Sequence, residues 1–285
     1  MDTFKTPEIV TISQSLIKAF FNKSVLVEHC PRKIFTKYFL KQEVQETTIK
    51  QLRGIYFERH VLGGGDLFSL PGHKTTGKDL LPTVRINEQI KRFKDVVVDN
   101  VMMVHPNINT QIPLIKRYNE RYLLKGVLDW FPTFVLYEGD IRLSIVDLKL
   151  TEDLTSDFGP FAWGNYENMN WLQGALYHHL VHDIDWELNK HLSPLQKRFI
   201  QRFENILNRE EELFLYLVFD YTEELRHKFY ESVWDYDKFK YVENQVEGTI
   251  HQIELNNLSE WQPNPCSECK NCLINCPVRA KIEKQ

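Results

Sequence analysis

Apolar residues in the first hundred positions recur every three to four residues, the spacing typical of amphipathic helices. The pattern predicts a short helix over 11–21 and a second helix that begins at Cys30-Pro31. A third helix is expected over 47–62, where three consecutive glycines end it, and a long fourth helix over 84–104. The first third of the chain is therefore predicted to be helical, apart from a loop over 67–82.

After Pro106 the pattern changes to the alternation and short apolar runs that are typical of strands. Strands are expected over 121–131, 133–137 and 141–150, with one turn at Phe131-Pro132-Thr133 and another at Glu138-Gly139-Asp140. The remaining predicted elements are strands over 213–219 and 227–234, and helices over 165–183, 194–208 and 239–253.

This order of elements predicts one α/β domain over 1–285, with an N-terminal helical segment over 1–46 and a C-terminal cysteine-rich segment over 258–285. The chain has 35 Lys and Arg against 39 Asp and Glu, and its formal charge of −4 argues against a polycation that coats nucleic acid. A local basic groove stays compatible with that charge. Neither a signal peptide nor a membrane-spanning apolar stretch is found, so a cytoplasmic protein without membrane contact is expected.

Two charged residues interrupt an apolar face of the strand predicted over 141–150. Side chains alternate between the two faces of a strand, so Asp147 and Lys149 share a face with Ile141, Leu143 and Ile145. A solvated charge pair at a strand end is one explanation. Unpaired charge on a buried face is costly, however, so the position of Asp147 and Lys149 on the apolar face favours a functional role for them.

Two further carboxylates can approach Asp147. Asp129 precedes it by 18 residues, enough for one hairpin, so both can lie on adjacent strands. Glu58 shares a helical face with Ile55, Val61 and Leu62. Gly54, one turn earlier, indicates a close approach by another part of the protein. For Glu58 alone, a place at the edge of an amphipathic helix is the other explanation.

Converging carboxylates repel one another unless a cation neutralises them. Hard cations such as Mg²⁺ or Mn²⁺ take oxygen ligands, so Glu58, Asp129 and Asp147 are predicted to bind one or two of these ions. The backbone carbonyl of Leu148 is a candidate for a further ligand. Lys149 can hold a nucleophilic water or stabilise charge that develops on a phosphate.

Four short motifs, in this order along the chain, resemble those of the PD-(D/E)XK nuclease superfamily: Gly54-x-x-x-Glu58, Gly126-Val-Leu-Asp129, Asp147-Leu-Lys149 and Gln173-x-x-x-Tyr177. Within it the chain is most similar to the RecB-type exonucleases that carry an iron–sulfur cluster, such as the CRISPR-associated adaptation nucleases and the nuclease part of AddB. The resemblance implies a restriction-endonuclease-like core, in which helices flank a central mixed β-sheet. It also implies a metal-dependent DNA exonuclease that acts on single-stranded ends beside helicase, recombination or adaptation proteins.

The resemblance assigns roles position by position. Asp129 corresponds to the second-motif aspartate, and Asp147 and Lys149 correspond to the third-motif acid and lysine. Glu58 stands where RecB-type members usually have histidine, a departure that related exonuclease branches share, so the resemblance implies that Glu58 is a metal ligand. His60 is a weaker candidate for the same role.

The fourth motif would position DNA or the active-site lysine. Gln173 and Tyr177 are four residues apart and therefore lie on one face of a helix. A semi-buried tyrosine at a helix edge is the other explanation of this spacing.

Four of the five cysteines lie within 266–276, in a C-x2-C-x2-C-x3-C-Pro run typical of iron–sulfur ligation, and a four-cysteine zinc site is the alternative. The resemblance implies that one remote N-terminal cysteine and a C-terminal triplet bind a single 4Fe–4S cluster, which joins the two ends of the chain. The cysteines assigned to it are Cys30, Cys266, Cys269 and Cys276, with Cys272 as a possible substitute.

Two other functions fit part of the pattern. One is a DNA-end-binding subunit of a recombination or adaptation complex that does not cleave, which the intact acidic residues and lysine disfavour. The other is a ferredoxin-like redox protein, which the single cysteine run and the long α/β body disfavour.

Overall fold

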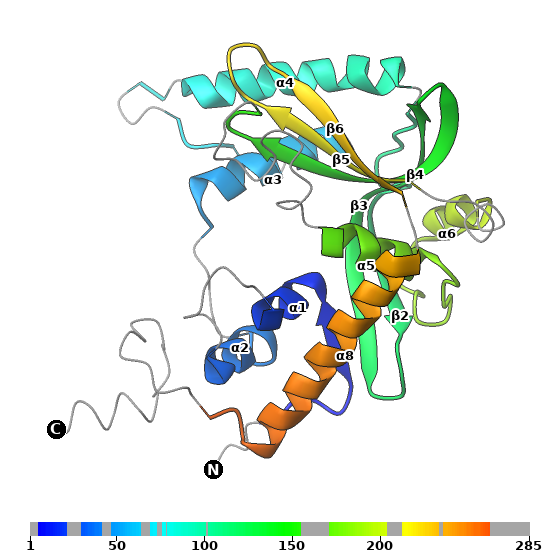
Figure 1. Ribbon diagram of the computed structural model, residues 1–285. Coiled ribbons are helices and arrows are strands. Elements are labelled where there is room, and N and C mark those ends of the chain that lie inside the picture. Colours follow the sequence, from blue (N-terminus) through cyan, green and yellow to red (C-terminus); the bar gives the residue numbers. More distant parts are fainter. Residues whose placement is uncertain are drawn as a thin grey trace. The chain divides into compact units, whose positions relative to one another are not determined.

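The computed structural model describes residues 5–21, 30–41, 47–63, 69–72, 76–77, 79–100, 102–154, 171–203, 213–233 and 236–262 of the 285. The chain divides into two compact units (Figure 1). The terminal unit combines 1–46, 116–125 and 240–285, and the main unit combines 47–115 and 126–239. Within the described ranges, no helix is both long and apolar enough to cross a membrane.

Six strands form one mixed sheet in the order β1-β3-β4-β5-β6, with β2 paired to β3. The pairs β1–β3 and β4–β5 are parallel, and the pairs β3–β4 and β5–β6 are antiparallel. The strands are β1 (Val10–Ser13), β2 (Thr110–Arg117), β3 (Tyr122–Tyr137), β4 (Asp140–Thr151), β5 (Leu213–Asp220) and β6 (His227–Val233).

Helices α3 (Ile49–Leu62), α4 (Leu81–Asp99), α5 (Trp171–Val181) and α6 (Pro194–Gln201) belong to the main unit. Helix α3 begins with a capping box, in which the Thr48 hydroxyl accepts from the Gln51 amide at 3.3 Å and the Gln51 side chain accepts from the Thr48 amide at 2.8 Å. This cap fixes the start of the helix that carries Glu58.

Helices α3 and α4 cover one face of the sheet and α5 the other (Figure 1). Phe57 of α3, Phe93 of α4 and Phe219 of β5 pack ring against ring, with centroids 5.1–6.5 Å apart. Alternation along β4 turns Val146 and Leu148 into this core. The intervening Asp147 faces the α5 side of the sheet, where Gln173 contacts it.

The terminal unit contains β1, α1 (Gln14–Phe21), α2 (Pro31–Tyr38) and most of α8 (Tyr236–Leu258). Its core is aromatic, because the ring of the fully buried Trp261 lies 5.2–5.3 Å from those of Phe35 and Phe39. Cys30 is buried immediately before α2.

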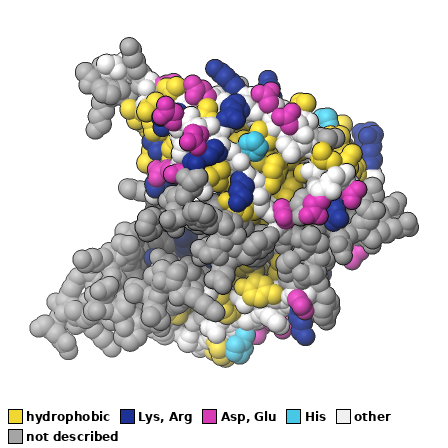
Figure 2. Space-filling view, turned by 45° about the horizontal axis from the view of Figure 1, so that its top comes forward, with side chains coloured by type: hydrophobic (Ala, Val, Ile, Leu, Met, Phe, Trp, Pro, Cys, Tyr) yellow, Lys and Arg dark blue, Asp and Glu magenta, His cyan; other side chains and the backbone are white. Residues whose placement is uncertain are grey.

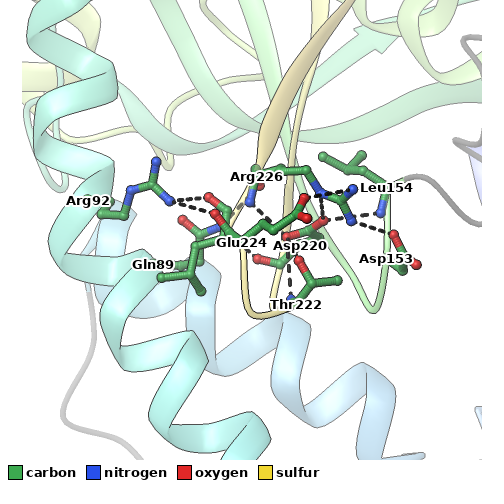
Figure 3. Close-up of polar contacts among 9 residues, drawn as sticks. Gln89, Arg92, Asp153, Leu154, Asp220, Thr222, Glu224 and Arg226 are labelled. Carbon is green, nitrogen blue, oxygen red and sulfur yellow. Dashed lines mark hydrogen bonds and ion pairs between the residues drawn. The ribbon is translucent and has the colours of Figure 1, made fainter.

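A polar cluster joins the end of β4 to the turn between β5 and β6 (Figure 3). Asp220 is fully buried, and its carboxylate accepts from the backbone amide and the Nε of Arg226 at 2.8 and 2.9 Å. Arg226 also forms an ion pair of 2.6 Å with Asp153, and the Leu154 amide donates to Asp220 at 3.3 Å. The cluster therefore fixes the chain where it leaves β4.

Three local predictions were wrong. Residues 11–13 belong to β1 because they pair in parallel with β3, a long-range contact that periodicity does not reveal. Residues 110–117 form β2, which was not predicted. Phe131-Pro132-Thr133 lies within β3 as an irregularity in the register, with the Phe131 amide bonded to the Asn109 carbonyl at 2.8 Å. The turn at Glu138-Gly139 is confirmed, and both residues have positive φ, as type I′ hairpins require.

Candidate active site

The structure brings Asp147 and Lys149 together on β4. Asp147 is 1 % exposed, and its carboxylate forms an ion pair with the Lys149 ammonium. The Lys149 side chain stays one-third exposed, and its nitrogen lies 5.8 Å from the ring centroid of Tyr216. Tyr216 is the residue of β5 that pairs with Asp147. The ion pair thus joins a buried carboxylate to a lysine side chain that is partly open to solvent.

Asp129 lies beside them on the neighbouring strand β3. It is 9 % exposed, and its Oδ2 accepts a hydrogen bond of 2.9 Å from the Leu148 amide. The backbone amide of Leu148, the residue between Asp147 and Lys149, therefore fixes the Asp129 carboxylate. Leu148 serves here through its amide, and its side chain packs into the opposite core.

Glu58 approaches from α3, at the edge of the helix face that packs on the sheet. That face carries Phe57, Val61 and Leu62, so the predicted apolar stripe is confirmed at Val61 and Leu62 and was wrong only at Ile55, which is exposed. A Cβ on Gly54 would meet nothing within 4 Å, so the close approach predicted there was wrong as well.

An amide bridges Glu58 to Asp129. The Nε2 of Gln111 donates to Glu58 Oε1 at 2.6 Å and makes a longer contact of 3.4 Å with Asp129 Oδ1. Gln111 comes from β2 and has a φ of +51°. The three predicted carboxylates thus belong to one connected group of polar residues.

Burial and mutual repulsion shape the ionisation of this group. Burial raises the pKa of the Glu58 carboxyl, and of its charged neighbours Lys149 lowers that pKa while Asp147 raises it. Burial, Asp147 and Glu58 together hold the pKa of Asp129 well above its usual range. Burial lowers the pKa of Lys149, but Asp147 and Asp129 outweigh it, so the pKa is raised and the ammonium stays charged.

Helix α5 brings both residues of the fourth motif to the site. The Nε2 of Gln173 donates to Asp147 Oδ1 and, at 2.9 Å, to the Tyr177 hydroxyl, which in turn donates to the Val127 carbonyl at 2.8 Å. A Cβ on Gly126 would lie 2.9 Å from the Tyr177 ring and 2.7 Å from Leu180, so glycine is required for this packing. Gln173 and Tyr177 therefore support Asp147 from behind.

Sequence reasoning missed two residues of this group. Gln111 lies on the unpredicted strand β2, and no spacing pointed to it. Tyr216 lies in the apolar run of β5, with its hydroxyl 3.5 Å from Gln173 Oε1. A buried tyrosine hydroxyl needs a polar partner, and that requirement was the available signal.

The candidate metal ligands are carboxylate oxygens, which hard divalent cations prefer. Because the fold raises the pKa values of Glu58 and Asp129, a cation that favours their ionised forms would offset this effect. Among the described residues, no three His, Cys, Asp or Glu side chains are arranged as a ready metal-ligand group. Lys149 and Gln173 bind Asp147, and Gln111 lies between the other two carboxylates. Positive or partly positive hydrogens thus neutralise the oxygens that a cation would contact.

The remaining predicted ligands are divided between described and undescribed parts of the chain. Cys30 is buried, and within the described part of the chain it forms no disulfide. Cys266, Cys269, Cys272 and Cys276 lie outside the described residues. On the face drawn in Figure 2, Lys and Arg side chains lie among Asp and Glu side chains, and no continuous basic groove stands out on its described part.

Comparison with protein-family models and with curated proteins gave no match. A solved structure from Eubacterium rectale, named "putative exonuclease", is similar with a TM-score of 0.57 and 18% identity, over 94% of this chain and 88% of its own. At this identity the likeness establishes a shared fold alone. It confirms the predicted α/β class with a mixed central sheet flanked by helices.

Proposed function

We propose that this protein is a metal-dependent DNA exonuclease of the PD-(D/E)XK type that hydrolyses phosphodiester bonds at single-stranded ends. The observation that carries this proposal is the placement of Asp129 and Asp147, buried on adjacent strands beside the Lys149 ammonium. A buried acid whose pKa is raised, such as Asp129 beside the charged Lys149, is typical of catalytic sites. The name of the structurally similar Eubacterium rectale protein supports the same chemistry.

Glu58, Asp129, Asp147 and the Leu148 carbonyl would hold one or two Mg²⁺ or Mn²⁺ ions. When bound, such an ion lowers the pKa of a water molecule and polarises a phosphoryl oxygen. The Lys149 side chain is one-third exposed, and its ammonium can stabilise the negative charge that develops on a phosphate.

Two residues of α5 and β5 would keep this group in place. Gln173 orients Asp147 through its amide, and Tyr216 lies beside both.

The exonuclease would act on DNA ends made by helicase, recombination or CRISPR-adaptation proteins.

A 4Fe–4S cluster would be bound by Cys30 with Cys266, Cys269 and Cys276, and Cys272 would be the substitute. Because Cys30 precedes the triplet by more than two hundred residues, the cluster would close a very long loop and couple iron binding to folding.

The test is digestion of 5′- and 3′-end-labelled single-stranded and duplex DNA in Mg²⁺ or Mn²⁺. Asp147→Asn removes the buried charge with little change in shape and is expected to lower the rate more than about a hundredfold. Asp140→Asn is the matched control, because Asp140 is on the same strand but exposed. It is expected to cleave like the wild type.

Equal degradation by wild type and Asp147→Asn would reject the assignment. Tight binding of DNA ends without cleavage in any divalent metal would favour the non-cleaving subunit instead.

A further inference from the structure

Gln111 occupies the space between two carboxylates that the proposed function assigns to a cation. Its Nε2 lies 2.6 Å from Glu58 Oε1 and 3.4 Å from Asp129 Oδ1, so these two oxygens are at most 6.0 Å apart. The amide hydrogens offset part of the repulsion between the two charges. A partly positive group thus lies at the point where positive charge is most needed.

The backbone of Gln111 has an unfavourable conformation. Its φ of +51° is in the left-handed region, where a Cβ lies too close to the following carbonyl oxygen. Such conformations persist where surrounding structure enforces them, and they concentrate at functional sites.

Thr110 provides that enforcement. Its side chain is buried, and its hydroxyl donates to the Leu62 carbonyl at 2.8 Å and accepts from the Asn107 amide at 3.0 Å. Leu62 is the last residue of α3, the helix that carries Glu58. The hydroxyl therefore ties the position of Gln111 to that of Glu58.

A carboxamide offers both a donor and an acceptor at its end. The NH₂ group satisfies carboxylates while no cation is present, and the carbonyl oxygen is a ligand that hard cations accept. A bound cation would repel the NH₂ group and attract the oxygen. Rotation about the last side-chain bond exchanges the two groups without moving the backbone.

We propose that Gln111 is a further ligand of the divalent cation. In the metal-free protein the Gln111 amide hydrogens offset part of the charge of Glu58 and Asp129, and when the ion binds, the Gln111 Oε1 turns to the ion. This inference rests on the proposed function, because that function supplies the cation. It assigns a role to a residue that none of the four motifs contains.

The test measures binding of Mn²⁺ to the full-length protein by electron paramagnetic resonance of the free ion, without DNA. Gln111→Met keeps the length of the side chain but removes both polar atoms, and we expect the Kd for Mn²⁺ to rise about tenfold. Gln111→Glu supplies a charged oxygen ligand, and we expect the Kd to fall several-fold below that of the wild type. Gln201→Glu, at an exposed position of α6, is the control for added charge and is expected to keep the wild-type Kd.

Gln111→Asn covers the case in which Gln111→Met fails to fold. Asparagine tolerates positive φ but is one methylene shorter, so it should fold and bind Mn²⁺ as weakly as Gln111→Met is expected to. Wild-type affinity in Gln111→Asn, or equal shifts in Gln111→Met and Gln111→Glu, would overturn this inference alone. Failure of the wild-type protein to bind Mn²⁺ would overturn the proposed metal-dependent function as well.

Discussion

Asp129 is a residue whose ionised form destabilises the fold that holds it. Its pKa is raised well above the usual carboxyl range by burial and by the charges of Asp147 and Glu58. In the unfolded chain the same carboxyl loses its proton near pH 4. The folded state therefore binds more protons than the unfolded state above that pH, and stability falls as the pH rises. The loss is complete once the pH exceeds the raised pKa of the folded protein.

Asp129→Asn should therefore stabilise the metal-free protein at neutral pH while it abolishes cleavage. The amide oxygen can still accept from the Leu148 amide, and the repulsion by Asp147 and Glu58 disappears. We expect Tm at pH 7 to rise by about 2–4 °C, the shift produced by 1 kcal/mol in a domain of this size. Thermal unfolding in chelator at pH 5 and pH 7 checks this, because the gain should shrink at the lower pH. An equal or lower Tm at pH 7 would contradict the electrostatic account.

Sequence patterns located the acidic residues of the site because charge on an apolar strand face is unusual. Period-two alternation was sufficient for Asp147 and Lys149, whose face of β4 is buried from Leu143 to Asp147. Gln111 carries no such signal, since polar residues on a short strand are ordinary. Its role depends on a contact with a helix 53 residues earlier in the chain, which only the folded structure supplies.

Helix α3 carries Glu58 but also contains a residue of poor helix propensity that has no packing reason to be there. Gly54 lies in the helix interior, and an added Cβ would meet nothing within 4 Å. Gly54→Ala should stabilise the protein by about 1 kcal/mol, the difference in helix propensity between the two residues. Urea unfolding of both proteins measures this change. A loss of cleavage in a stabilised Gly54→Ala variant would show that substrate passes close to this helix.

The connection from β5 to β6 offers a comparison of two carboxylates that share one arginine. Asp220 is fully buried and 2.9 Å from Arg226, whereas Asp153 is 40 % exposed and 2.6 Å away. Distance alone would rank Asp153 as the stronger partner. Burial reverses the order, because solvent screens the exposed pair and removal of Asp220 leaves buried amides without an acceptor.

Asp220→Ala is accordingly expected to lower the free energy of unfolding by about 3 kcal/mol, and Asp153→Ala by less than about 1 kcal/mol. Chemical denaturation of the two variants and the wild type measures both values. Similar losses in the two variants would show that burial does not decide the strength of this cluster.

Periodicity predicted the boundaries of those helices and strands whose own apolar residues pack on the core. The long helices α3 and α4 and the apolar strand β5 were located close to their predicted ranges. The strand β1 was not, because four residues beside a helix become a strand only through pairing with Tyr122–Lys125. Short edge segments depend on such distant partners, and local sequence does not encode the pairing.

At the scale of the whole molecule, the terminal unit is assembled from three stretches that are far apart in the sequence. The Thr6 backbone amide and hydroxyl both bind the side chain of Asn257, at 3.2 and 2.8 Å. Contacts across some 250 residues are entropically costly to form without a further link. A cluster bound by Cys30 and the C-terminal cysteines would supply that link.

Cys30→Ser should therefore remove iron and lower Tm by about 10 °C or more, by analogy with a covalent link that closes a long loop. Cys272→Ser is the matched control, since the preferred ligand set leaves Cys272 free and predicts about four iron atoms per chain in that variant. Anaerobic purification with iron, sulfide and zinc counting, followed by thermal unfolding, measures both effects. Iron loss in Cys272→Ser with retention in Cys276→Ser would exchange the two residues in the ligand set. One zinc and no iron in the wild type would show that the cysteines form a zinc site instead of an iron–sulfur cluster. The proposal for the acidic site in the main unit would be unaffected, because the contacts described for that site involve no cysteine.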